Sequence, residues 1–172
     1  MSETKAPRRH PNVVHLDEVE SSGFGKGTKF GHTAKRLSKA SEGKSLGCSW
    51  YEVPSGKSAF PAHFHCALEE AIYVLEGEGT LRVGKERIAV RAGDYLAFPP
   101  GPDYAHRLDN TGSGLLRYLC FSGWTPGQVE VIGYPDSGKV AFSAGTWEKP
   151  IARAMLRNGV ETKDYFEGEE TE

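Results

Sequence analysis

The sequence has no long apolar run and almost no net charge, and each absence excludes a class of protein. The longest uninterrupted apolar run, Ala71–Leu75, is far shorter than the 18 or more residues that a membrane span needs. The 21 Lys and Arg residues nearly balance the 23 Asp and Glu residues, leaving a net charge of -2. Such a balance argues against a general nucleic-acid binder. We therefore expect neither a membrane nor a nucleic acid as a partner.

Cysteines and recognisable targeting or catalytic motifs are also scarce. The three cysteines, Cys48, Cys66 and Cys120, are odd in number and form no C-x-x-C pair. This pattern fits a reducing compartment better than a disulfide scaffold, and we expect each thiol to be a small buried hydrophobe. The N-terminus has no apolar segment typical of a secretory signal, and no serine sits in a nucleophile elbow. These absences predict a cytoplasmic protein that does not hydrolyse its substrate through a serine.

Glycine, proline and short apolar segments, in contrast, are plentiful. The chain has 172 residues, of which 38% are hydrophobic, 21 are glycine and 10 are proline. This length suits one domain, and the composition favours an all-β fold with many tight turns. Short alternating segments bounded by Gly, Pro or Asn recur between residues 46 and 122, as in a β-sandwich or barrel. We predict strands at Gly47–Val53, Glu70–Glu76, Thr80–Val83, Arg87–Arg91, Tyr95–Phe98, Tyr104–Leu108 and Leu115–Phe121.

The segments on either side of this region differ from it in charge. Residues 1–45 carry an excess of positive charge and include the glycine-rich stretch Gly23–Gly31. We interpret them as an N-terminal extension, poor in strands, that adds to the sheet or wraps a dimer partner. Residues 123–172 carry an excess of negative charge and are predicted to hold further strand, a short helix at Pro150–Asn158 and an acidic tail. Only the spacing of Ile151, Ala154 and Met155 suggests that helix.

Three histidines in the middle of the chain are candidates for a metal site. His63 and His65 are two residues apart, so their rings project from the same face of an extended strand. Glu69 and Glu70, immediately before an apolar strand, could bring a carboxylate to the pair. His106 could add a third nitrogen only if the sheet curls back on itself, as it does in a small barrel. Imidazoles with a carboxylate form a donor set that divalent metals use.

The surrounding residues resemble the first motif of the cupin superfamily, G-x5-H-x-H-x(3,4)-E-x6-G. The segment PAHFHCALEEAIYVLEG supplies two histidines, a glutamate and the closing Gly77 at this spacing. Glu70 leaves six residues before Gly77, whereas Glu69 leaves seven, so Glu70 is the better match. Gly56 is one residue out of place as the leading glycine. The resemblance therefore implies His63, His65 and Glu70 as metal ligands.

The second cupin motif, G-x5-P-x-G-x2-H-x3-N, resembles GDYLAFPPGPDYAHRLDN. Four residues separate Gly101 from His106, where the pattern has two, and Tyr104 occupies the position that a strict count gives to histidine. Either the loop bulges and His106 completes a site of three histidines and one glutamate, or Tyr104 faces the cavity instead. We favour the bulge, because an additional residue pair beside Pro99–Pro102 is easily absorbed in a turn.

The resemblance implies a double-stranded β-helix, the cupin jelly-roll barrel, with a divalent transition metal inside one end. The ligand set alone does not choose among Fe, Mn, Ni, Zn and Cu. An open coordination position would suit a metal-dependent enzyme of the oxygenase, isomerase or lyase type that acts on a small polar or anionic molecule. A binding or sensor protein for a sugar-like molecule is the alternative, and a homodimer is expected. Candidate cavity-lining aromatics are Tyr73, Tyr95, Phe98, Tyr104 and Trp50.

Overall fold

The structure is a computed structural model that describes residues 9–123, 125, 127–145 and 150–157. Within these residues the chain forms thirteen strands and three short helical segments. The helical segments are η1 (Leu16–Glu18), α1 (Leu37–Ala40) and η2 (Pro102–Tyr104). In this part of the chain, no helix is long and apolar enough to cross a membrane. The predicted all-β class is confirmed.

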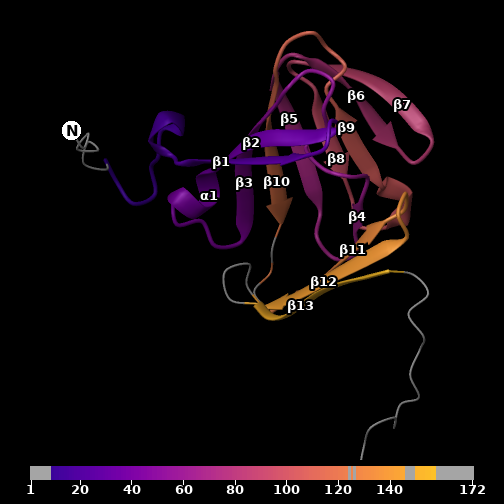
Figure 1. Cartoon of the computed structure of the whole chain (residues 1–172). Coiled ribbons are helices and arrows are strands. Elements are labelled where there is room, and N and C mark those ends of the chain that lie inside the picture. The colour runs from indigo at the N-terminus through magenta and orange to yellow at the C-terminus, as the bar shows by residue number, and fades with distance from the viewer. Residues whose placement is uncertain (1–8, 124, 126, 146–149, 158–172) are drawn as a thin grey trace, which may run out of the picture.

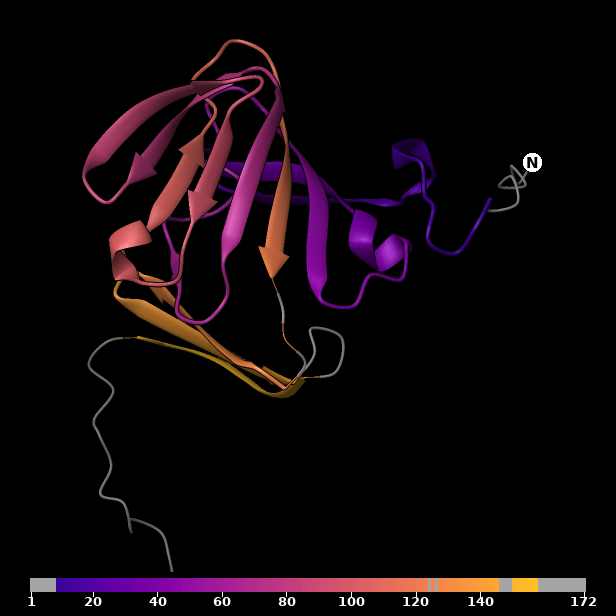
Figure 2. The ribbon, with the colours of Figure 1, turned by 180° about the vertical axis from the view of Figure 1, so that it is seen from behind.

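Two sheets fold over one another to form the barrel (Figures 1 and 2). One has six strands in the order β1-β2-β3-β10-β5-β8, and the other has three in the order β7-β6-β9. All neighbouring strands pair antiparallel, so the architecture is the predicted double-stranded β-helix. The bounds are β1 Ser21–Lys26, β2 Phe30–Arg36, β3 Leu46–Val53, β5 Glu70–Glu76, β6 Glu78–Val83, β7 Glu86–Arg91, β8 Tyr95–Phe98, β9 His106–Asp109 and β10 Leu116–Gly123.

The core of the barrel arises from the alternation along its strands. On β5, Ile72 and Val74 point inward and are buried, whereas Tyr73 and Leu75 point outward and are exposed, as a period of two requires. The strand ends at Gly77, whose backbone has φ 85°. A Cβ at Gly77 would lie only 2.3 Å from the Leu115 carbonyl oxygen, so this motif position accepts only glycine.

A third sheet, with the order β13-β12-β11-β4, lies across one end of the barrel (Figures 1 and 2). It consists of β4 (Phe64–His65), β11 (Val129–Tyr134), β12 (Lys139–Gly145) and β13 (Pro150–Arg157). β4 has only two residues, and it pairs with β11 through Phe64 and His65. The C-terminal sheet is therefore joined directly to the histidine pair of the sequence motif.

The predicted helix at Pro150–Asn158 is wrong, since residues 150–157 form the strand β13. Its backbone pairs along β12 from Lys139↔Arg157 to Gly145↔Pro150. A helix would have buried Ile151 and Met155 on one face, yet Ile151 is 87% exposed and Met155 is also exposed. The backbone hydrogen bonds to β12 favour a strand more strongly than the helical spacing of three apolar residues favours a helix, because a helix here would have no surface to pack against.

The N-terminal extension contains more strand than its sequence suggests. β1 and β2 form an antiparallel hairpin, and β2 pairs with β3, so the hairpin widens the six-stranded sheet (Figure 1). Every residue of β1 is exposed, as suits the edge of a sheet. The glycine-rich stretch Gly23–Gly31 lies mostly in this hairpin, and the expectation that residues 1–45 are poor in strands is wrong.

Candidate metal centre

His63 and His106 are neighbours because their backbones pair with each other. The His63 amide donates to the His106 carbonyl at 3.1 Å, and the His106 amide donates to the His63 carbonyl at 2.9 Å. This antiparallel bridge joins two positions that are 43 residues apart and places both side chains on one face. The ring centroids lie 4.7 Å apart. Closure of the barrel thus brings together two imidazoles from the two sequence motifs.

Glu70, the first residue of β5, extends its carboxylate to the same point. Its Oε2 atom lies 3.5 Å from His63 Nε2, 3.4 Å from His65 Nε2 and 3.2 Å from His106 Nε2. The ligand atoms of His63, Glu70 and His106 all lie within 4.8 Å of one another. The structure therefore brings together all four residues that the motifs single out, with His65 at the margin of the cluster.

The two rings of the His63–His106 bridge are held in the same tautomer. His63 Nδ1 lies 2.9 Å from the Pro61 carbonyl oxygen, and His106 Nδ1 lies 3.0 Å from the Tyr104 carbonyl oxygen. A carbonyl only accepts, so each Nδ1 carries the proton and each Nε2 presents its lone pair to the centre. Phe98 stacks on the His106 ring at 3.6 Å between centroids, which fixes the plane of that ring.

Cys120, on β10, contacts the other oxygen of the Glu70 carboxylate. Its thiol donates to Glu70 Oε1 at 2.8 Å, which leaves Oε2 facing the imidazoles. Burial and the nearby Glu70 charge raise the pKa of the Cys120 thiol well above its usual range, so the thiol keeps its proton. The sequence alone predicts Cys120 to be a small buried hydrophobe; its alternation with the core residue Tyr118 is the signal that could have placed it beside the centre.

Glu130, from β11, lies on the outer side of His65. It is 3% exposed, and its Oε1 atom lies 3.4 Å from His65 Nδ1. Its two oxygens accept the amide protons of Cys66 and Leu68, each at 3.0 Å. His65 is thus located between two carboxylates, Glu70 and Glu130. No sequence motif points to Glu130, which lies 60 residues beyond Glu70.

These contacts shift the titration of the central groups. Burial alone would lower the pKa of His65, but the carboxylates of Glu130 and Glu70 outweigh it and raise that pKa to about 9. Burial alone would raise the pKa of Glu70, but His106, His63 and His65 hold it well below its usual range. The two shifts favour an ionised Glu70 carboxylate beside a protonated His65 imidazole.

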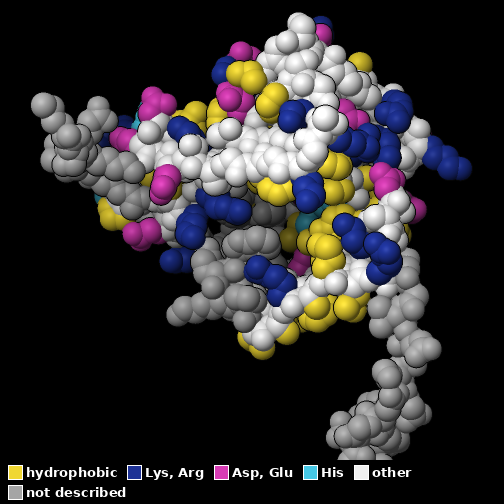
Figure 3. Space-filling view, in the orientation of Figure 1, with side chains coloured by type: hydrophobic (Ala, Val, Ile, Leu, Met, Phe, Trp, Pro, Cys, Tyr) yellow, Lys and Arg dark blue, Asp and Glu magenta, His cyan; other side chains and the backbone are white. Residues whose placement is uncertain are grey.

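A narrow cavity of about 20 Å³ opens onto the centre. This volume is close to what one water molecule occupies. Figure 3 shows the molecule hollowed between the β2 side of the barrel and the C-terminal sheet, with histidine and acidic side chains inside and basic ones around the opening. The wall is mostly apolar, and it is formed by Ala59, Phe60, Pro61, Ile72, Leu108, Tyr118 and Cys120, together with the centre residues His63, Glu70 and His106 and the neighbouring Arg107.

The additional residue pair in the second motif forms the short helical turn η2. Within it, Tyr104 is 42% exposed and only its backbone carbonyl contacts the centre, through His106. His106 itself is 3% exposed. The turn therefore absorbs the two residues and leaves the histidine, and not the tyrosine, inside the barrel. In the first motif, Glu69 is exposed and Glu70 faces the centre.

The other aromatic candidates do not form the cavity wall. Tyr73 and Tyr95 pair across β5 and β8 on the outer face and are exposed, because their neighbours Ile72 and Leu96 occupy the core. Trp50 lies on the face of β3 opposite the core residue Tyr51, with Lys35 over its ring. The expectation is therefore wrong for these three residues and for Tyr104. Phe98 serves the site through its stacking on His106, and the aromatics that line the cavity are Phe60 and Tyr118.

The cysteine expectation is also wrong for Cys66, which is exposed. It follows the two-residue strand β4, where the chain leaves the sheet before β5 begins. Cys48 is half-buried.

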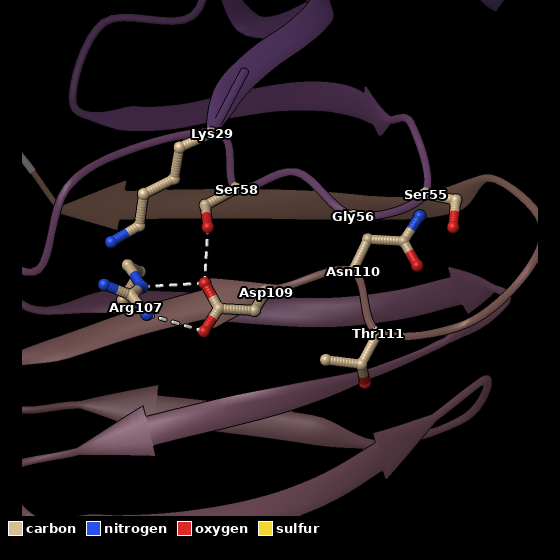
Figure 4. A pocket seen from close by; sticks show the side chains of 8 residues that line it. All are labelled: Lys29, Ser55, Gly56, Ser58, Arg107, Asp109, Asn110 and Thr111. Atoms are coloured by element: carbon tan, nitrogen blue, oxygen red, sulfur yellow. Dashed lines mark hydrogen bonds and ion pairs between the residues drawn. The ribbon is translucent and has the colours of Figure 1, made fainter. Parts of the chain in front are cut away.

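A second, more open cavity of about 400 Å³ lies outside the barrel (Figure 4). Arg107 makes two hydrogen bonds to Asp109, at 2.7 and 2.8 Å, and Ser58 also donates to this carboxylate. Asn110, the motif asparagine, donates to the carbonyls of Val53 and Gly114. The Ser58–Asp109 contact fastens β9 to the segment before the histidine pair, and the bond from Asn110 to Val53 joins the end of β9 to β3. The lining residues are Lys29, Ser55, Gly56, Ser58, Arg107, Asp109, Asn110 and Thr111.

Comparison with known proteins agrees with this architecture. Residues 49–122 match the family model of the cupin domain. The chain is 36% identical over 70 residues to an uncharacterized protein of Methanocaldococcus jannaschii, covering 41% of this chain and 54% of that protein. It is 34% identical over 77 residues to quercetin 2,3-dioxygenase of Bacillus subtilis, covering 45% of this chain and 23% of the dioxygenase. The chain thus spans about half of the first relative and about a quarter of the second.

The fold extends further than the sequence likeness. The crystal structure of a proposed sugar phosphate isomerase from Acidithiobacillus ferrooxidans superposes with a TM-score of 0.75, at 20% identity, covering 89% of this chain and 96% of that one. A jelly-roll barrel with a histidine and glutamate cluster at one end defines the class of protein. Residues 49–122, which carry this cluster up to His106, are a cupin domain by their match to the family model.

Proposed function

We propose that this protein is a metal-binding cupin that acts on or binds a small polar or anionic molecule. The observation that carries the proposal is the surroundings of Glu70 Oε2. This buried atom has three imidazole nitrogens 3.2–3.5 Å away, and among the described residues it makes no well-formed hydrogen bond. A buried carboxylate oxygen without such a partner is costly, whereas a cation among these four side chains would satisfy it.

The donor set fits a divalent transition metal. Neutral imidazole nitrogens and one carboxylate oxygen suit Fe, Mn, Ni, Zn and Cu, and His63, His65, Glu70 and His106 would hold the ion. Such an ion would supply Lewis acidity toward a carbonyl, carboxylate or hydroxyl oxygen. The chain itself contributes the rest of the environment: Phe60, Ile72 and Tyr118 line the cavity with apolar surface, and Cys120 fixes the orientation of the Glu70 carboxylate.

Metal analysis of the purified full chain tests the binding step. We expect about one equivalent of a transition metal per chain, lost in the variant that combines His63→Ala with His65→Ala. Substitution of His15, an exposed histidine far from the motifs, should leave the metal content unchanged. Metal-free wild-type protein that takes up no divalent ion would contradict the proposal.

An assay panel then separates turnover from binding. The quercetin 2,3-dioxygenase likeness supports the inclusion of oxygen uptake in that panel. Turnover that disappears when the metal is removed and returns when it is restored would establish an enzyme of the oxygenase, isomerase or lyase type. Metal-dependent binding of a sugar-like molecule without turnover would establish the sensor alternative.

We further propose that the protein works in the cytoplasm as a homodimer. The exposed edge strand β1 supports association, because uncovered sheet edges pair readily with another chain. Light scattering at micromolar concentration should give twice the 18.8 kDa mass of the chain; a monomer mass would reject the dimer.

A further inference from the structure

Glu130 is a buried carboxylate outside the cupin motifs. It lies on β11, beyond residues 49–122 that match the cupin domain, and it is 3% exposed. Burial of a carboxylate is expensive unless hydrogen bonds or charges compensate for it. The amides of Cys66 and Leu68 and the ring of His65 are the compensating groups. The three lie on the segment that joins the histidine pair to Glu70.

His65 differs from His63 and His106 in the group that lies beside its Nδ1 atom. His63 Nδ1 and His106 Nδ1 each donate to a backbone carbonyl. His65 Nδ1 makes no well-formed hydrogen bond within the described residues, and it lies 3.4 Å from Glu130 Oε1. A small rotation of either side chain closes this distance to a hydrogen bond.

We propose that Glu130 is a positioning residue of the metal centre, which accepts the Nδ1–H of His65 and keeps its Nε2 aimed at Glu70 Oε2. The inference rests on the proposed function, because it takes His65 as a ligand. Carboxylates that hold a ligating histidine in this way fix its tautomer and ring orientation, and their loss weakens metal binding 10–100-fold.

The strand pairing explains why this residue comes from the C-terminal sheet. His65 pairs with Ile132, and the Cys66 amide donates to the Val131 carbonyl at 2.9 Å. This register places Glu130 beside the end of β4. β4 has two residues, too few to hold a histidine ring by itself. The metal centre is thus completed by a segment beyond the matched domain.

Titration of metal-free, full-length protein with Co²⁺ tests this role, since its visible absorption reports the ligands around the ion. We expect Glu130→Gln to weaken Co²⁺ binding 10–100-fold and to change the absorption spectrum. Glu52→Gln is the matched control: it removes an equal charge from a residue that pairs with Arg117 on the sheet. That control should bind Co²⁺ as the wild type does.

A double-mutant cycle separates positioning from support of the loop. If Glu130 acts through His65, Glu130→Gln should cause no further loss of Co²⁺ affinity in a His65→Ala background. An equal loss in both backgrounds would mean that Glu130 only holds the Cys66–Leu68 backbone, and would overturn the proposal. Glu130→Gln affinity within twofold of the wild type would overturn it as well.

A measurement on the wild type covers the case in which Glu130→Gln does not fold. In the Zn²⁺-loaded protein, ring ¹⁵N spectra should show His65 protonated at Nδ1 and bound through Nε2; the opposite arrangement contradicts the proposal. If wild-type protein binds Co²⁺, loses it in His63→Ala and yet shows no dependence on Glu130, only the positioning role fails. If the wild type binds no divalent ion, the proposed function fails with it.

Discussion

At the scale of single residues, hydrogen bonds hold the outer atoms of the candidate centre, and the inner atoms of its side chains are left to face one another. The outer nitrogens of His63 and His106 donate to carbonyls, and Cys120 donates to one oxygen of Glu70. The remaining lone pairs of these residues therefore point at one another. Side chains oriented in this way lose little freedom when an ion binds.

Loss of the Cys120 hydrogen bond should destabilise the metal-free protein. Cys120→Ala leaves Glu70 Oε1 buried without this donor, and we expect a free energy of unfolding about 1–3 kcal/mol lower. Cys120→Ser keeps a donor and should recover part of that loss. Urea unfolding of both variants is the measurement. A Cys120→Ser protein no more stable than Cys120→Ala would show that the hydrogen bond contributes nothing.

The second motif leads to a separate prediction about Tyr104 and His106. Since only the backbone of Tyr104 contacts the centre, Tyr104→Ala should retain the metal content of the wild type. His106→Ala should lose it, because the bridge partner of His63 then has no ring. Elemental analysis of the two purified variants compares them directly, and metal loss in Tyr104→Ala would contradict the geometry.

At the scale of elements, the packing of β4 against β11 requires a glycine at position 133, which has no side chain. Phe64 lies over Gly133, and a Cβ added to Gly133 would be 2.2 Å from the ring. Gly133→Ala should therefore push β4 away, lower the free energy of unfolding by about 1–3 kcal/mol and weaken metal binding through the neighbouring His65. Gly23→Ala, on β1 with nothing within 4 Å, is the control. Equal stability of the two variants would rule out this contact.

The attachment of β9 to the segment before the histidines should depend on pH. The pKa of Asp109 is lowered: burial acts to raise it, but hydrogen bonds from Arg107 and Ser58 outweigh that effect. Because the unfolded chain takes up the proton first, the stabilisation is complete above about pH 3.8 and is lost as pH falls toward the folded-state pKa.

Asp109→Asn should accordingly cost about 1.5–3 kcal/mol of unfolding free energy at pH 7. The difference from the wild type should shrink when unfolding is measured below pH 3.8. Asp103→Asn, an exposed position on η2, should be close to neutral throughout. A difference between Asp109→Asn and wild type that stays constant from pH 7 to pH 3 would contradict the role assigned to this carboxylate.

At the scale of the whole molecule, the sequence predicts the barrel better than its surroundings. Strands Glu70–Glu76 and Tyr95–Phe98 are predicted to the residue, because period-two alternation and Gly or Pro turns are local signals. Local signals do not reveal β13, because its sequence has a weak helical spacing and its pairing with β12 depends on tertiary structure. The hairpin at Gly23–Gly31 has few apolar residues to reveal it.

The site is predictable only where its residues fall within one motif. His63, His65 and Glu70 lie within eight residues of one another, whereas Cys120 and Glu130 reach the centre through strand pairings that join distant segments. The sequence does not establish which face of each strand is inward, so it predicts Tyr73 and Tyr95 as cavity aromatics where the structure has Phe60 and Tyr118. The sequence would therefore predict the cavity wall only if it also established which residues of each strand face inward.

The most direct measurement is a crystal structure of the full chain with anomalous scattering recorded across the transition-metal edges. We predict one anomalous peak inside the barrel, at bonding distance from Nε2 of all three histidines and from the Glu70 carboxylate, and the absorption edge would identify the ion. A crystal grown with added divalent metal that shows no peak there, or rings turned away from that point, would contradict this prediction.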